Sequence, residues 1–131
     1  MARIGKTKEE IRDYIGLNYY KEVLNEDFTS LVKKYGHVDK SSEDGFDWIY
    51  ITCQGSVPHA IRAFLASTSF EDAIRNAIFL GGDSDTLACM TGSIAEAYYG
   101  MTPYKELEVF DRLPDDLANI CYAFEVKKKS Q

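Results

Sequence analysis

Residues 74–100 read IRNAIFLGGDSDTLACMTGSIAEAYYG, and this stretch decides the fold of the chain. Apolar residues recur at helical spacing on both sides of the glycine pair Gly81-Gly82. Glycine reaches left-handed backbone conformations at little cost, so the pair predicts a sharp turn between two helices. Small residues along one side of the second helix, such as Ala88 and Gly92, predict that another helix packs closely against it.

The predicted turn concentrates side chains that carry oxygen atoms. Asp83, Ser84, Asp85 and Thr86 follow the glycines directly and begin the second helix. Carboxylate and hydroxyl oxygens suit a hard cation such as magnesium. The same residues also fit a helix cap at Asp83 or Ser84 with first-turn charge at Asp85, because negative charge at a helix N-terminus is favourable by roughly 0.3–1 kcal/mol. The residues alone leave both interpretations open.

A family resemblance starts at this turn. Residues 81–100 resemble the C-terminal signature of the ADP-ribosylglycohydrolases, which include the dinitrogenase-reductase-activating glycohydrolases. That signature runs Gly-Gly-Asp-(Ser/Thr)-Asp-Thr and continues into a small-residue helix that ends near Tyr-Tyr-Gly. The similarity extends through residues 54–76, QGSVPHAIRAFLASTSFEDAIRN, and more weakly through residues 5–15, GKTKEEIRDYI.

The resemblance implies a metal-dependent site. In the family, the two aspartates and the threonine of the signature ligate a two-magnesium site. Carried over position by position, these ligands are Asp83, Asp85 and Thr86, with Asp83 and Asp85 as the catalytic carboxylates. The implied cofactor is Mg²⁺ or Mn²⁺, and the implied ligand is an ADP-ribosylated substrate or ADP-ribose.

A second group of candidate residues precedes the third predicted helix. Ser56 is predicted to cap this helix, with Pro58 in its first turn. A helix N-terminus favours a bound anion, which makes Gln54, Gly55 and Ser56, together with Gly82, candidate substrate-binding residues. A plain N-cap is the alternative interpretation.

The chain departs from the family pattern in its N-terminal part. Family members carry a Thr-Asp-Asp-Thr motif and a Gly-Asn-Gly-Ser type loop in their N-terminal half, and neither is present here. The acidic pair Asp115-Asp116 follows Pro114 and is typical of a helix start. The chain therefore resembles the C-terminal half of the family domain, and we expect catalysis to require a complementary N-terminal half.

The remaining patterns predict an all-α fold. Capping patterns occur at Thr7–Glu10 and Ser69–Asp72. Residues 46–55 are strongly apolar and are predicted to form a buried extended segment. We expect a single domain over residues 1–131, a compact orthogonal bundle of five or six helices that resembles the C-terminal half of the ADP-ribosylglycohydrolase fold.

Composition narrows the class of protein. The 131 residues are 45% hydrophobic and 27% charged, with a net charge of −6. An acidic chain without a basic block argues against nucleic-acid binding, and no apolar run is long enough to span a membrane. The odd cysteine count, Cys53, Cys89 and Cys121 in apolar surroundings, predicts buried thiols in a reducing, cytoplasmic compartment.

Two functions follow from these predictions. The first is magnesium-dependent hydrolysis of ADP-ribosyl glycosidic bonds, provided that the missing half completes the site. The second is a non-catalytic family remnant that acts as an interaction module, binds a separately encoded N-terminal half, or forms a homo-oligomer through helix faces left uncovered. A phosphatase of the Asp-x-Asp-x-Thr type is disfavoured because Leu87 stands where that chemistry needs a hydroxyl group.

Overall fold

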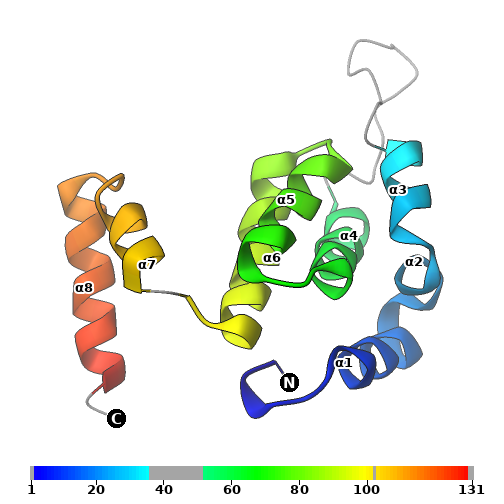
Figure 1. Ribbon diagram of the computed structural model, residues 1–131, viewed down its shortest axis with the longest axis horizontal. Helices are drawn as coiled ribbons and strands as arrows, with labels where there is room; N and C mark the ends of the chain where they lie inside the picture. The colour runs from blue at the N-terminus through cyan, green and yellow to red at the C-terminus, as the bar shows by residue number, and fades with distance from the viewer. Residues whose placement is uncertain (1, 36–51, 102, 130–131) are drawn as a thin grey trace. The chain divides into compact units, whose positions relative to one another are not determined.

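The computed structural model describes residues 2–35, 52–101 and 103–129 of the chain, and all regular structure in these ranges is helical. The predicted all-α fold is therefore confirmed. The elements are a 3₁₀ turn Ala2–Ile4, α1 Lys8–Ile15, a π-helical stretch Gly16–Tyr20, α2 Lys21–Asn25, α3 Phe28–Tyr35, α4 Cys53–Ala66, α5 Phe70–Leu80, α6 Ser84–Tyr99, α7 Pro103–Phe110 and α8 Asp115–Lys129 (Figure 1). The structure has more helical segments than the five or six expected, because the π-helical stretch separates α1 from α2 and because residues 103–110 form the short helix α7.

Two of the predicted helix caps are confirmed. The Thr7 hydroxyl accepts a hydrogen bond from Glu10 N, while the Glu10 carboxylate accepts one from Thr7 N at 2.8 Å, which is a complete capping box. The Ser69 hydroxyl accepts a hydrogen bond from Asp72 N at 3.1 Å and begins α5.

The predicted start of α4 is wrong by four residues. Thr52, in an extended conformation, is the N-cap, and its hydroxyl accepts a hydrogen bond from Gly55 N at 3.2 Å. Because Thr52 takes the capping role, the chain is already helical at Gly55 and Ser56, and Pro58 lies inside the helix instead of in its first turn. Most of the apolar segment 46–55 lies outside the described residues.

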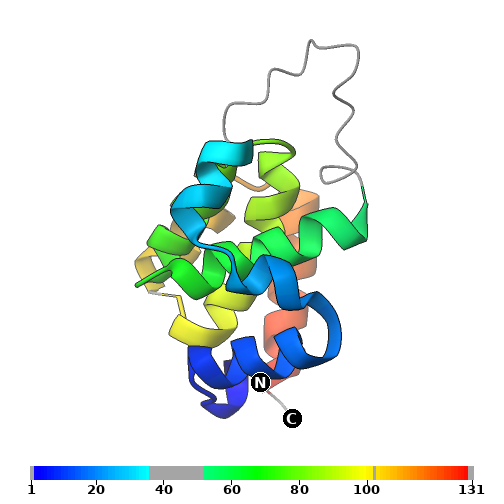
Figure 2. The same ribbon diagram turned by 90° about the vertical axis from the view of Figure 1, so that its right-hand side faces the viewer.

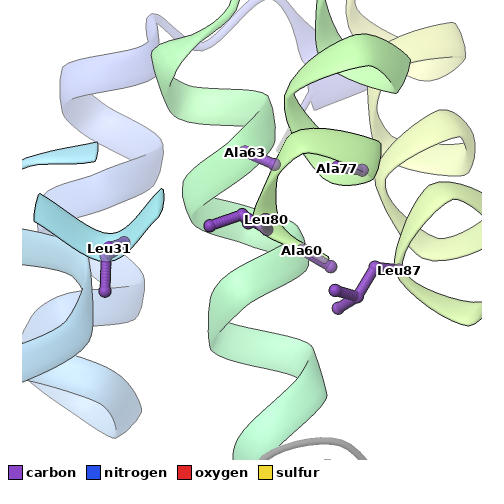
Figure 3. Packing of buried hydrophobic residues seen from close by; sticks show 6 residues of the cluster. All are labelled: Leu31, Ala60, Ala63, Ala77, Leu80 and Leu87. Carbon is purple, nitrogen blue, oxygen red and sulfur yellow. The ribbon is translucent and has the colours of Figure 1, made fainter. Parts of the chain in front are cut away.

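The core is built where α4, α5 and α6 pack on one another, with α3 against α4 and α5. One cluster of buried side chains joins these four helices, and Figure 3 shows its six members, Leu31, Ala60, Ala63, Ala77, Leu80 and Leu87. A second cluster joins Ile11 of α1 to Phe64 of α4, Ala73 of α5 and Ala95 of α6. These clusters fix the positions of the helix ends that carry the candidate site.

The small residues of α6 allow the close helix packing that the sequence predicts. A Cβ atom added at Gly92 would lie 2.9 Å from the Cδ1 atom of Ile74 on α5. On the neighbouring side of α6, the buried Thr91 hydroxyl donates a hydrogen bond to the Ala60 carbonyl of α4 at 3.1 Å. Helix α6 therefore contacts both of its neighbours at close range.

The chain divides into two compact units, residues 1–100 and 101–131. In the second unit, the rings of Phe110 and Tyr122 stack with centroids 4.5 Å apart, which joins α7 to α8. Helix α8 begins after Pro114, as predicted, and several of its apolar side chains are exposed, including Ile120 and Phe124. The single domain over residues 1–131 stays a prediction.

The cysteines are less buried than predicted. Cys53 and Cys89 are exposed and Cys121 is half-buried, and all three are free thiols. The prediction failed because Cys53 begins α4 at the surface and Cys89 lies on an exposed position of α6. In the part of the chain that the structure describes, no helix has both the length and the apolar character needed to cross a membrane.

Candidate functional site

The chain reverses between α5 and α6 at a pair of glycines. Gly81 has φ 75° and Gly82 has φ 68°, a region that residues with a Cβ atom rarely adopt. The flanking residues Leu80 and Leu87 are both buried in the core cluster, where Figure 3 shows them beside Ala60. The six residues between the two leucines are therefore anchored in the core at both ends.

The structure separates the two interpretations of the acidic residues that follow. Asp83 occupies the N-cap position of α6, yet its carboxylate makes no capping hydrogen bond to the helix, and its φ and ψ of −80° and 71° lie outside the extended region typical of a cap. Ser84 is the first residue of the helix, so it is not the cap either. A side-chain cap by Asp83 or Ser84 is therefore absent, whereas Asp85 lies in the first turn of the helix as the capping interpretation also predicts.

Asp85 and Thr86 complete the first turn of α6, and both are exposed. We call the segment from Gly81 to Thr86 the acidic turn. Its oxygen donors lie at the N-terminus of a 16-residue helix, where the unpaired backbone N–H groups and the helix dipole favour negative charge. The turn therefore presents carboxylate and hydroxyl oxygens beside the N-terminus of α6.

The donor set has the right chemistry for a hard cation but is small. Asp83, Asp85 and Thr86 offer two carboxylates and a hydroxyl, whereas magnesium takes about six oxygen ligands in near-octahedral geometry. No group of three or more His, Cys, Asp or Glu side chains suited to a metal ion occurs within residues 2–35, 52–101 and 103–129. The acidic turn thus fits part of a magnesium site.

The other candidate residues lie in the first turn of α4. Gln54 is exposed, whereas Gly55 N and Ser56 N both donate to the Thr52 carbonyl, at 3.1 and 2.9 Å. The Ser56 hydroxyl also donates to that carbonyl, at 2.9 Å. Among these three residues, Gln54 has the side chain best placed to contact a ligand, and substrate binding by the group stays a prediction.

One contact relates the two helix starts in space. The hydrogen bond from Thr91 to the Ala60 carbonyl lies about two turns into both α6 and α4. Since a helix rises 1.5 Å per residue, each helix start lies about 10 Å from this contact. This contact shows that α4 and α6 pack on each other, and it does not place the first turn of α4 beside the acidic turn.

The structure also settles the histidine on α4. His59 is buried, with 4% of its surface exposed, and its Nδ1 atom lies 2.6 Å from the Gly55 carbonyl oxygen. Because a carbonyl only accepts hydrogen bonds, Nδ1 is the donor. The sequence favours a surface or hydrogen-bonded histidine over a metal ligand at this position, and the structure shows a buried, hydrogen-bonded one. Trp48, predicted to fill the core with ligand stacking as the alternative, and His37, a predicted loop residue, lie outside the described residues.

A second polar cluster lies at the opposite end of α5. The Lys8 ammonium of α1 donates to the carbonyl oxygens of Phe64, at 2.8 Å, and of Leu65 and Ser67 at the end of α4. The same nitrogen lies 4.8 Å from the centre of the Phe64 ring and 5.1 Å from that of Tyr99. We call this the lysine cluster. Sequence reasoning missed it, since Lys8 looks like an ordinary residue in the first turn of α1.

Comparisons with known proteins match this chain to a family. The family model described as ADP-ribosylglycohydrolase matches residues 2–125. The ADP-ribosylhydrolase ARH3 of Homo sapiens and that of Mus musculus are each 37% identical to this chain over 81 residues, and that of Bos taurus is 35% identical. Each match covers 53% of this chain and 20% of the relative, so it spans about a fifth of the length of these proteins. No solved structure gave a significant match.

Proposed function

The chain belongs to the ADP-ribosylglycohydrolase family, and from this premise we propose that it contributes the acidic turn to a magnesium-dependent site that hydrolyses ADP-ribosyl glycosidic bonds. The observation that carries the proposal is the N-cap residue Asp83, whose carboxylate makes no capping bond, beside the exposed Asp85 and Thr86. Exposed oxygen atoms at the start of α6 are in a position to contact a ligand. The family and its ADP-ribosylhydrolase relatives supply the class of substrate.

The proposed roles follow from the chemistry of each side chain. Asp83, Asp85 and Thr86 would hold Mg²⁺ or Mn²⁺ through oxygen atoms. When bound, the metal would orient the ribose hydroxyls and lower the pKa of an attacking water. Asp83 and Asp85 are the catalytic carboxylates of the proposal, because hydrolysis of a glycosidic bond passes through an oxocarbenium-like state that nearby negative charge stabilises.

The backbone of the acidic turn supports substrate binding as well. Gly82 has no side chain, so an anionic group can approach its backbone closely. The first N–H groups of α6 point out of the helix N-terminus, which favours a phosphate group there. Gln54, exposed in the first turn of α4, is the further candidate for substrate binding and would contribute a hydrogen-bonding amide.

Because the acidic turn offers few oxygen ligands, the proposal requires further magnesium ligands from elsewhere. Two carboxylates and a hydroxyl leave about half of the magnesium coordination to water, so we expect affinity in the millimolar range at best for these residues alone. Further ligands must come from outside the described residues, and a complementary N-terminal half is the source that we propose. The cytoplasm is the proposed location.

A second function is favoured by a specific surface. Ile78 and Phe79, in the last turn of α5 directly before the acidic turn, are 55% and 66% exposed. Apolar residues beside an incomplete site are expected where another polypeptide packs. If the completed site does not turn over, the chain is an interaction module that binds such a half or a second copy of itself.

The test uses two aspartates in equivalent positions. Asp85 is the second residue of α6, and Asp116 is the second residue of α8 and equally exposed. Magnesium binding is measured by calorimetry and ADP-ribosyl release by a cleavage assay, for the chain alone and with a complementary half added in trans or fused.

We expect completion to tighten magnesium binding and to produce cleavage. Asp85→Ala should abolish both gains, whereas Asp116→Ala should leave them unchanged. A completed protein that is active and indifferent to Asp85→Ala would show that the acidic turn is not the metal site. Micromolar magnesium affinity of the chain alone would contradict the need for completion.

A further inference from the structure

Helix α2 packs against α4 (Figure 2). A polar cleft of about 170 Å³ is lined by residues of α1, α2 and α4. Lys8, Glu9 and Arg12 of α1 and Arg62 of α4 contribute charged groups to its lining, and Leu24 and Leu65 contribute apolar walls. Nothing in the proposed hydrolysis uses these residues.

Arg62 enters the cleft as a cation without a paired carboxylate. Its Nε atom donates to the Glu26 carbonyl at 2.8 Å, and this acceptor is neutral. Asp27, the acid whose charge acts on Arg62, accepts hydrogen bonds from the amide and hydroxyl groups of Ser30 at the start of α3 and makes no ion pair with Arg62. Within the described residues, both terminal nitrogens of Arg62 lack a hydrogen-bond acceptor, which leaves four N–H donors unused.

The guanidinium group of Arg12 also has N–H donors that make no hydrogen bond within the described residues. Its Nε atom and one terminal nitrogen donate to the same carboxylate oxygen of Asp13, at 3.0 and 2.9 Å, and the described part of the chain offers no acceptor to the other terminal nitrogen. Burial lowers the pKa of Arg62, Asp27 raises it, and the positive charge of Arg12 lowers it again. The two guanidinium groups are thus close enough to repel each other, with unused donors on both.

We propose that this cleft binds the phosphate group of a small molecule between Arg62 and Arg12. The planar guanidinium fork matches the spacing of phosphate oxygens, and charge-assisted pairs of this kind are about twice as strong as neutral hydrogen bonds. A cleft of about 170 Å³ accommodates a phosphate group with part of an attached sugar. Leu24 and Leu65 exclude water from one side, which strengthens the electrostatic attraction.

Substitution of Glu9 is expected to change the affinity for phosphate in the opposite direction to substitution of Arg62. Its exposed carboxylate lines the same cleft and repels an anion there. Glu9→Gln should therefore tighten phosphate binding, whereas Arg62→Gln should weaken it. Arg75→Gln is the control, because Arg75 pairs with Glu71 at 2.7 Å on the exposed surface of α5 and does not line the cleft.

The experiment titrates the full chain with inorganic phosphate, and then with AMP, at constant ionic strength without magnesium. Calorimetry gives affinities, and the NMR signal of the Arg62 Nε–H group gives the place of binding. We expect a millimolar dissociation constant for phosphate and a tighter one for AMP if the sugar is also bound. Arg62→Gln should weaken binding at least tenfold, Glu9→Gln should tighten it about twofold, and Arg75→Gln should change neither.

Several results would overturn the proposal. One is equal response to phosphate and to chloride, which would indicate general ionic strength. Another is a phosphate titration of the unmodified chain that leaves the Arg62 signal unmoved, a result that does not depend on how well any variant folds. Because no metal or cleavage is involved, failure here leaves the proposed hydrolysis untouched, and failure of hydrolysis leaves the cleft untouched.

Discussion

The two ends of α5 are both joined to a neighbouring helix by three residues, and they use their polar groups in opposite ways. At the N-terminal end, the hydroxyl and carbonyl of Ser67 bind Lys8 and Tyr99, and Ser69 and Asp72 cap the helix. At the C-terminal end, Asp83 makes no capping bond and Asp85 is exposed. The first junction holds the fold together, and the second holds oxygen atoms at the surface.

The comparison gives a physical way to distinguish structural from functional polar residues. A helix N-terminus gains about 1 kcal/mol from a good cap, so a chain selected only for stability is expected to use one. At Ser69 the chain does so, whereas at Asp83 it places a suitable residue and does not make the bond. The following predictions measure this difference, beginning with the largest expected effect.

The largest effect is expected at the lysine cluster. Lys8→Met removes the ammonium group that binds carbonyl oxygens at the end of α4, and these carbonyls are left without their charged donor. Hydrogen bonds to charged groups contribute about 1.5–3 kcal/mol, so we expect the free energy of unfolding to fall by about 2–3 kcal/mol. Urea denaturation of the first unit or of the full chain measures this loss.

The control is a lysine two residues away. Lys6 pairs with Glu10 at 2.7 Å, but both side chains are more than 40% exposed. Exposed ion pairs contribute little, so Lys6→Met should cost less than about 0.5 kcal/mol. Equal losses for the two substitutions would mean that the lysine cluster does not stabilise the N-terminal junction of α5.

Sequence patterns predicted the local structure better than the contacts between distant residues. The capping box at Thr7 and the cap at Ser69 depend on residues three positions apart, and both were predicted. The lysine cluster joins Lys8 to residues more than 50 positions later, and no local pattern encodes it. For Arg62 the sequence contains a weak indication of a special role, because it is the single charged residue of α4 in a largely apolar stretch.

The start of α4 shows a different limit. Thr52 and Ser56 are both good N-cap residues, and the proline at position 58 made the later one look preferable. Which of them caps the helix depends on the tertiary structure around α4, and sequence spacing does not contain that information. The acidic turn was located correctly because the glycine pair at 81 and 82 dictates where the chain reverses.

An intermediate effect is expected from the cap of α5. Ser69→Ala removes the hydroxyl that accepts the hydrogen bond from Asp72 N, and we expect a loss of about 1 kcal/mol in the free energy of unfolding. Ser93→Ala is the matched control, since Ser93 is exposed within α6 and its hydroxyl donates to the Cys89 carbonyl of the same helix. Alanine has the higher helix propensity, so this control should be neutral or slightly stabilising. A Ser69→Ala protein as stable as the control would remove the distinction between the two junctions.

The smallest effect on stability is expected at the acidic turn, and it is the most informative one. Asp72 and Asp85 both lie in the first turn of a helix, but only Asp72 accepts hydrogen bonds from the backbone and side chain of Thr68, at 2.7 and 3.1 Å. Asp72→Ala should therefore cost about 1 kcal/mol. Asp85→Ala loses a helix-dipole interaction of roughly 0.3–1 kcal/mol and gains helix propensity, so the net change should stay within about 0.5 kcal/mol.

The same Asp85→Ala protein connects stability to function. If the Asp85 carboxylate binds a ligand, its removal should leave the free energy of unfolding, measured by urea denaturation without magnesium, almost unchanged. The same substitution should abolish magnesium binding in the completed site. A residue whose loss costs function but not stability is one that the fold does not need for itself. If Asp85→Ala instead destabilises the chain as much as Asp72→Ala, the carboxylate is structural, and the two ends of α5 differ only in the way that they are capped.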